Sequence, residues 1–247
     1  DSFSADSAIA SIYPGILFTR GQFKEGLEAL QLVVTKTGEN PSMLSPNLMY
    51  FSSYFLSMVE VPESLREVVF GLIAETAQLC MDLRNESFLE ELLPGVVDWR
   101  AMELLGLAKV QLREFDEAVE ILSKLHEEKP DQESVTLWLA EAYISRGTYD
   151  DLKFGLGTLL PLLENTMSPD PWILAAAACV ALSEFDDARS FWSQAVLRAE
   201  LGLTSIHRRR LFNGLLTMFN VLDGKPSPGK GAYGVLGAIM SRKPLQS

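Results

Sequence analysis

A segment of about 34 residues that occurs three times in succession is the feature that most constrains this chain. The copies span residues 101–130, 134–165 and 171–200. Each copy has an aromatic residue at the equivalent position. Phe115 and Tyr149 are 34 residues apart, and Tyr149 and Phe185 are 36 residues apart. A period of this length indicates stacked units, each too small to bury its own apolar face. The chain is therefore predicted to be a repeat protein built from helical pairs.

Each copy has the same order of residue types. A small residue stands nine positions before the aromatic, and it lets the first helix approach the second; these residues are Gly106, Ala140 and Ala176. An acidic pair follows the aromatic, and we expect it in the first turn of the second helix, where the positive end of the helix dipole favours it. Pro130 ends the first copy, because proline cannot continue a helix. The two extra residues of the second copy are expected near 155–157 or Pro161.

These residues resemble tetratricopeptide repeats, which are helix–turn–helix units with small, aromatic and proline positions in this order. The resemblance is closest over 99–130, weaker over 133–166 and 169–200, and weakest over 7–38, where 21–26 echo the motif. It covers about half of the chain. The resemblance implies an all-α fold, a right-handed α-solenoid of helix–turn–helix repeats with a concave face that binds peptides or helices.

The remaining sequence also favours helices. Residues 46–60, 62–84 and 85–93 are predicted to be divergent repeat helices within 7–93, and 203–222 a C-terminal capping helix, which a solenoid needs to cover its last face. Residues 1–224 would then form one solenoid. A linker and a short apolar tail follow at 225–247, in which 232–240 either pack on the body or meet a partner.

The resemblance also implies which residues line the concave groove. Carried over by position, they are Arg100, Glu103, Leu107, Val110, Gln111, Leu137, Glu141, Ile144, Ile173, Ala177 and Val180. Some family members grip an acidic chaperone peptide with Lys, Asn and Arg. Glu103, Leu107, Leu137 and Glu141 stand at the matching positions and would not hold that ligand.

An apolar groove with two glutamates suits an amphipathic helix that carries a few basic residues. This helix could come from a partner protein, from a second copy of the chain or from residues 232–240. The alternative is that neighbouring helices fill the groove as part of the core.

Net charge limits the partners further. The chain carries a net charge of −12 with a pI near 4.7, which disfavours nucleic acid as a partner. Arg208, Arg209 and Arg210 form a basic cluster that is a candidate dock for acidic side chains, a phosphate or an anionic membrane surface. A solvated helix face is the alternative for this cluster. The longest apolar run, 173–182, is too short to cross a bilayer, which takes roughly 20 residues.

Nothing in the sequence favours catalysis. The chain has two histidines and no glycine-rich loop between a strand and a helix. The acidic pairs recur with the repeat, which explains them as structural. We expect no catalytic residue, no metal and no cofactor, and we expect Cys80 and Cys179 to be buried free thiols.

The sequence thus predicts a scaffold or adaptor that binds a helical or extended segment of another protein. A structural subunit of a homo-oligomer or larger assembly is the alternative, as is a non-catalytic binding domain of a longer protein. The sequence starts without Met and without a signal peptide. We expect a soluble, cytoplasmic protein. The alternative that a targeting segment was removed before position 1 stays open.

Overall fold

The computed structural model describes residues 61–83, 97–199 and 206–223, together with parts of 13–32. Within this portion the secondary structure is helical and contains no strand. The chain divides into two compact units, unit 1 (residues 1–128) and unit 2 (residues 129–247), and each is described by itself. The helices expected at 46–60 and 85–93 and the tail at 225–247 lie outside the described residues.

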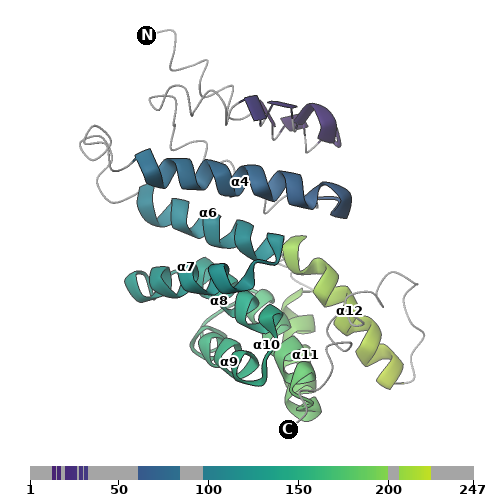
Figure 1. Cartoon of the computed structure of the whole chain (residues 1–247). Helices are drawn as coiled ribbons and strands as arrows, with labels where there is room; N and C mark the ends of the chain where they lie inside the picture. Colours follow the sequence, from purple (N-terminus) through teal and green to yellow (C-terminus); the bar gives the residue numbers. More distant parts are fainter. Residues whose placement is uncertain are drawn as a thin grey trace. The chain divides into compact units, whose positions relative to one another are not determined.

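The described part of unit 1 contains three long helices (Figure 1), which are α4 (Glu63–Leu83), α6 (Val97–Leu112) and α7 (Phe115–Glu128). Helix α6 packs against both α4 and α7. A Cβ built on Gly106 would lie 2.5 Å from Cδ2 of Leu122, so a larger residue would require the Leu122 side chain or the helices to shift. The close approach of the two helices that was predicted at Gly106 is therefore confirmed.

The described part of unit 2 contains five helices, which are α8 (Glu133–Arg146), α9 (Tyr149–Leu163), α10 (Asp170–Ala181), α11 (Phe185–Ala199) and α12 (Ile206–Leu222). Helix α8 packs against α9, and α10 packs against α8, α9, α11 and α12. The three copies of the repeat correspond to the hairpins α6–α7, α8–α9 and α10–α11. The helix predicted over 203–222 corresponds to α12.

The turn before each aromatic of the repeat motif contains a left-handed residue, although the hydrogen bonds that close the turns differ, since the amide of Gly147 donates to the carbonyl of Tyr143 at 3.1 Å. A residue with a left-handed backbone stands two positions before the aromatic, at Gly21 (φ 75°), Arg113 (φ 66°), Gly147 (φ 77°) and Ser183 (φ 64°). After Arg113, the amide of Glu114 donates to the carbonyl of Lys109 at 2.9 Å, which is the long hydrogen bond of a Schellman motif. The corresponding bonds run from Gln22 to Leu17 at 2.9 Å and from Glu184 to Cys179 at 2.8 Å. The weak echo at 21–26 thus has the turn of the clear repeats.

The second copy accommodates its extra residues after α9. Helix α9 runs without a break through Gly155, Gly157 and Pro161. Six residues, 164–169, join α9 to α10, whereas four residues, 129–132, join α7 to α8. The expected insertion within 155–161 was therefore wrong, because the loop takes up the difference and the helix stays regular.

The core of unit 2 is centred on α10. Residues 173–180 are all buried, since α10 is covered by α8, α9, α11 and α12. Cluster members on the other helices include Leu159, Trp192 and Leu215. The apolar run at 173–182 is therefore largely an internal helix. Among the described helices, none combines the length and the apolar character that crossing a membrane requires.

Candidate functional site

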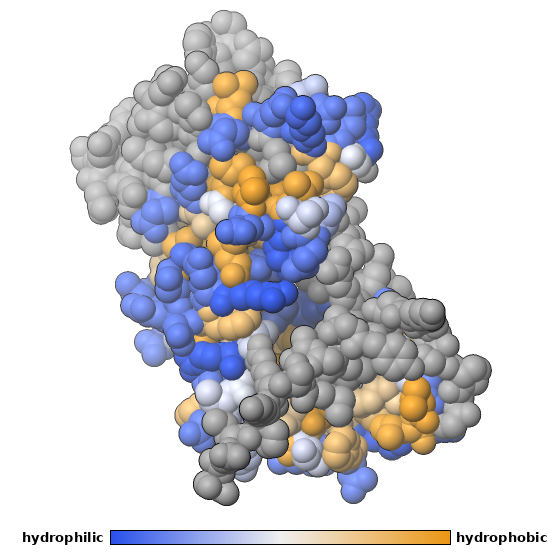
Figure 2. All heavy atoms as spheres, turned by 45° about the vertical axis from the view of Figure 1, so that its right-hand side comes forward, coloured by the Kyte–Doolittle hydropathy of each residue, from blue (hydrophilic) through white to orange (hydrophobic). Residues whose placement is uncertain are grey.

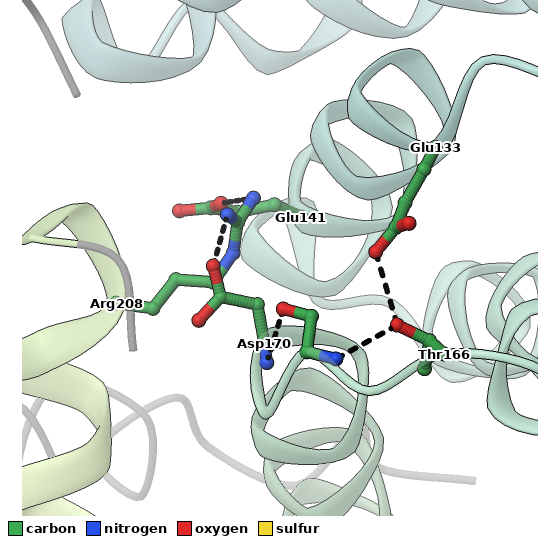
Figure 3. Close-up of polar contacts among 6 residues, drawn as sticks. Glu133, Glu141, Thr166, Asp170 and Arg208 are labelled. Atoms are coloured by element: carbon green, nitrogen blue, oxygen red, sulfur yellow. Dashed lines mark hydrogen bonds and ion pairs between the residues drawn. The ribbon is translucent and has the colours of Figure 1, made fainter. Parts of the chain in front are cut away.

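The feature of unit 2 that most resembles a recognition site is the way α12 is held on α8 and α10. Arg208 of α12 donates from Nη2 to Oε2 of Glu141 at 2.8 Å and from Nη1 to Oδ2 of Asp170 at 3.2 Å (Figure 3). The arginine side chain is 4% exposed, and those of Glu141 and Asp170 are 18% and 6% exposed. One guanidinium thus joins three helices through two carboxylates that are shielded from water. We call these three residues the Arg208 clamp.

The start of α10 positions Asp170 for the clamp. Ser168 Oγ accepts from the amide of Asp170 at 3.3 Å, and Thr166 Oγ1 accepts from the amide of Ser168 at 3.1 Å. Thr166 in turn donates to Oε1 of Glu133 at 3.2 Å, which ties this turn to the start of α8 (Figure 3). Asp170 lies in the first turn of α10, near the positive end of the helix dipole. The start of α10 is therefore held by hydrogen bonds that do not involve α12.

An aromatic ring completes the surroundings of Arg208. Its guanidinium carbon lies 4.7 Å from the centroid of the Trp138 ring of α8, a cation–π contact. The planar guanidinium can stack on a ring and donate to two carboxylates at once, which a lysine ammonium cannot do in the same way. Because the three charges are largely out of water, removing one partner leaves the others unpaired, at a cost of about 3–5 kcal/mol for a fully buried pair. The clamp therefore selects an arginine at position 208.

The apolar side of α12 continues the contact beyond the clamp. Leu215 and Phe219 belong to one buried cluster with Ile173, Ala177 and Val180 of α10. The Phe219 ring also stacks on Trp192 of α11, with centroids 5.6 Å apart. We call Trp138 and Glu141 of α8, with Asp170, Ile173, Ala177 and Val180 of α10, the docking face. The helix that contacts it in this chain is α12, which is amphipathic and has Arg208 near its N-terminal end.

The residues predicted to line an open groove lie largely inside the protein. Seven are buried, namely Glu103, Leu107, Val110, Leu137, Ile173, Ala177 and Val180. Gln111, Glu141 and Ile144 are half-buried, and the side chain of Arg100 is outside the description. In unit 1, Gln111 accepts from Arg66 of α4 at 2.7 Å. In unit 2, α12 contacts Glu141 and packs in one cluster with Ile173, Ala177 and Val180. Leu137 and Ile144 pack instead with Leu159 and Leu163 of α9.

Of the predicted basic dock, the structure describes only the Arg208 side chain. Arg208 is buried and pairs within the chain, and the side chains of Arg209 and Arg210 are outside the description. One signal in the sequence could have revealed this pairing. Asp170 at a helix start and Glu141 on an apolar helix are acids that need a cation, and an amphipathic helix with arginines follows them.

Two other titratable groups of unit 2, Cys179 and Asp151, have pKa values that are shifted by their surroundings within the fold. Burial raises the pKa of the Cys179 thiol to about 12, with a further contribution from nearby Glu184, so the thiol stays protonated. Hydrogen bonds from Arg146 hold the pKa of Asp151 below its usual value. In the part of the chain that the structure describes, no group of three or more His, Cys, Asp or Glu side chains is arranged to hold a metal ion. The side chain of Cys80 is outside the description.

The surface of the described residues also carries apolar side chains. Figure 2 shows hydrophobic residues interspersed with hydrophilic ones on the face that it draws. In unit 2 the most exposed of them are Phe154, Met167 and Leu197, with 63%, 64% and 60% of their surface accessible. Scattered exposed apolar residues are normal in soluble proteins, and a continuous stripe on one element is the informative case.

Comparison with known proteins adds no assignment. No family model matches the chain, and no curated protein matches it in sequence.

Proposed function

We propose that this chain is a tetratricopeptide-like solenoid that acts as a protein-interaction scaffold, and that its docking face binds an amphipathic helix carrying an arginine. The Arg208 clamp is the observation that carries the proposal. The face already holds a helix of this type, with two acids and a tryptophan around one arginine and apolar side chains below it. A partner helix with the same pattern would compete with α12 for the face.

The repeat itself supports the proposal. Three hairpins, each with a left-handed residue in its turn, follow one another along the chain, as the resemblance implies for a peptide-binding solenoid. A helix in such a groove is recognised by apolar anchors one turn apart and by a few charges. In α12 these anchors are Leu211, Leu215 and Phe219, spaced four residues apart.

Competition in trans tests this function on the full chain. The double variant Leu215→Asp with Phe219→Asp weakens the docking of α12 and leaves the acceptors Glu141 and Asp170 in place. A synthetic peptide of residues 203–223 is expected to bind this variant with a micromolar Kd, as measured by fluorescence anisotropy. It should not bind the unchanged chain, because α12 in cis has a high effective concentration.

The matched control is the same peptide with Arg208→Ala, which should bind at least about ten-fold more weakly because it leaves two carboxylates unpaired. Circular dichroism checks that the double variant keeps its helices. Proteins captured from the source cells by the double variant should be displaced by the 203–223 peptide and retained with the Arg208→Ala peptide. A helical double variant that binds neither peptide nor protein at this face would contradict the proposal.

A further inference from the structure

The Arg208 clamp contacts the guanidinium at its two terminal nitrogens. Nη2 donates to Glu141 of α8 at 2.8 Å, and Nη1 donates to Asp170 of α10 at 3.2 Å (Figure 3). The internal nitrogen Nε is buried and has no hydrogen-bond partner within the part of the chain that the structure describes. Hydrogen bonding to the guanidinium therefore depends on the two terminal nitrogens.

The two acceptors lie on different helices, and each terminal nitrogen has its own carboxylate. A guanidinium holds its terminal nitrogens in one rigid plane, so a single side chain reaches Glu141 and Asp170 at once. A lysine ammonium has one nitrogen and acts as a point charge, so it would have to serve both carboxylates from one place. The arrangement of the two acids thus matches a guanidinium better than an ammonium.

The aromatic side of the clamp also suits a guanidinium that carries no methyl groups. Proteins that bind methylated cations enclose them in a cage of aromatic rings. Among the described residues, one ring makes a cation–π contact with Arg208, that of Trp138 at 4.7 Å, while the edge of the guanidinium faces two carboxylates. The arginine side chain is buried, so methyl groups on its terminal nitrogens would lie where the clamp places hydrogen-bond acceptors.

We propose that the docking face recognises a partner helix by an arginine whose two terminal nitrogens are unsubstituted. The face discriminates against lysine at this position and against arginine that is methylated on a terminal nitrogen. This inference rests on the proposed function, because it concerns the same face, and it adds the chemical form of the side chain that the face accepts. A methylated form of the same helix is therefore a weaker ligand.

Charge alone does not produce this discrimination. Arginine, lysine and methylated arginine each carry one positive charge, and methylation removes donor hydrogens while it keeps the charge. In asymmetric dimethylarginine one terminal nitrogen has no hydrogen left, so either Glu141 or Asp170 loses its donor. Both carboxylates are largely shielded from water, which therefore replaces the missing donor incompletely. Loss of such a hydrogen bond to a charged group lowers affinity by about ten-fold or more.

Four peptides test the discrimination on the full chain that carries Leu215→Asp and Phe219→Asp. They span residues 203–223 and differ only at position 208, where they carry arginine, Arg208→Lys, asymmetric dimethylarginine or symmetric dimethylarginine. In fluorescence anisotropy the last three are expected to bind about ten-fold or more weakly than the arginine peptide.

The outcomes separate this inference from the proposed function. If the lysine peptide or the asymmetric dimethylarginine peptide binds as tightly as the arginine peptide, the inference is overturned and the proposed function stands. If the arginine peptide itself does not bind, the proposed function fails, and the inference fails with it.

A further variant assigns the discrimination to the clamp. Glu141→Ala, added to the same chain, removes one acceptor and leaves space beside Asp170. Asymmetric dimethylarginine can then donate to Asp170 from its unsubstituted nitrogen and place its methyl groups in that space. The arginine and asymmetric dimethylarginine peptides should therefore bind this variant with affinities within about three-fold of each other, as expected when one change removes the partner of the other.

The matched control is Asp186→Ala, which removes one exposed acid of α11 outside the clamp. It lowers the negative charge of unit 2 by the same amount and should keep the full discrimination between the two peptides. Circular dichroism checks that each variant keeps its helices. Discrimination that persists unchanged in Glu141→Ala, or that disappears equally in Asp186→Ala, would place its origin outside the clamp and overturn the inference.

Discussion

Arg208 illustrates how the contribution of an ion pair to stability depends on its exposure to water. Arg208 and its two acceptors are largely out of water, whereas Arg189 pairs with Asp223 at 2.7 Å with both side chains substantially exposed. Exposed pairs contribute about 0–1 kcal/mol, since water and salt screen them. The two arginines therefore form a matched comparison within unit 2.

Arg208→Met is expected to lower the free energy of unfolding by about 3 kcal/mol, because it leaves Glu141 and Asp170 without their cation. Arg189→Met should lower it by less than about 1 kcal/mol. Urea denaturation followed by tryptophan fluorescence measures both values. Equal losses in the two variants would show that Arg208 does not hold α12 through its charge.

The left-handed turn residues lead to a second prediction at this scale. Ser183 and Gly147 occupy equivalent positions, and a residue with a Cβ is strained in this conformation. Ser183→Gly should therefore raise the free energy of unfolding by about 0.5–1 kcal/mol, and Gly147→Ala should lower it by about 1 kcal/mol. The same urea titration reports both changes, and shifts of the same sign would contradict this account of the turns.

At the scale of elements, the spacing of paired helices is set by single small residues. Gly106 lies against the buried side chain of Leu122, whereas a Cβ on Gly71 of α4 would meet nothing within 4 Å. Alanine is a better helix former than glycine, so Gly71→Ala should raise stability by about 0.5–1 kcal/mol. Gly106→Ala should lower it by about 1–2 kcal/mol, because α6 and α7 must move apart. Thermal unfolding followed by circular dichroism compares the two variants. A higher stability of Gly106→Ala would mean that the Leu122 side chain can shift without an energetic penalty.

The sequence predicted the helices of each hairpin well. It said much less about which other element packs on the outer face of a hairpin. The period of the aromatics predicted the hairpins, and Gly106 was correctly read as a close approach, because contacts inside a unit repeat with the unit. Glu141 was read as a groove residue open to a partner. Its cation lies 67 residues away on a helix outside the repeat, and no period links the two. Burial of a face depends on which other element packs there, and that was not encoded in the repeat pattern.

Charge is distributed unevenly over the whole molecule. Residues 1–128 hold 21 acidic and 9 basic side chains, which accounts for the entire net charge of −12. Salt weakens repulsion among like charges, with a Debye length of about 10 Å at 0.1 M. Unit 1 should therefore gain stability as salt rises, and unit 2 should change little.

Hydrogen exchange measured by mass spectrometry at about 20 and 300 mM NaCl tests this difference. Peptides from α6 and α7 are expected to exchange more slowly at the higher salt concentration, and peptides from α10 and α11 should exchange at nearly the same rate in both. A uniform response of the two units would contradict the assignment of the repulsion to unit 1.

The position of α12 at the end of the described chain has a consequence for protein turnover. If a protease cut between α11 and α12 and α12 then dissociated, the remaining part of unit 2 would present Ile173, Ala177 and Val180 beside two uncompensated acids. Such a surface is adhesive and is of the kind that chaperones and degradation systems recognise. The contacts that hold α12 therefore also keep this apolar and acidic surface covered.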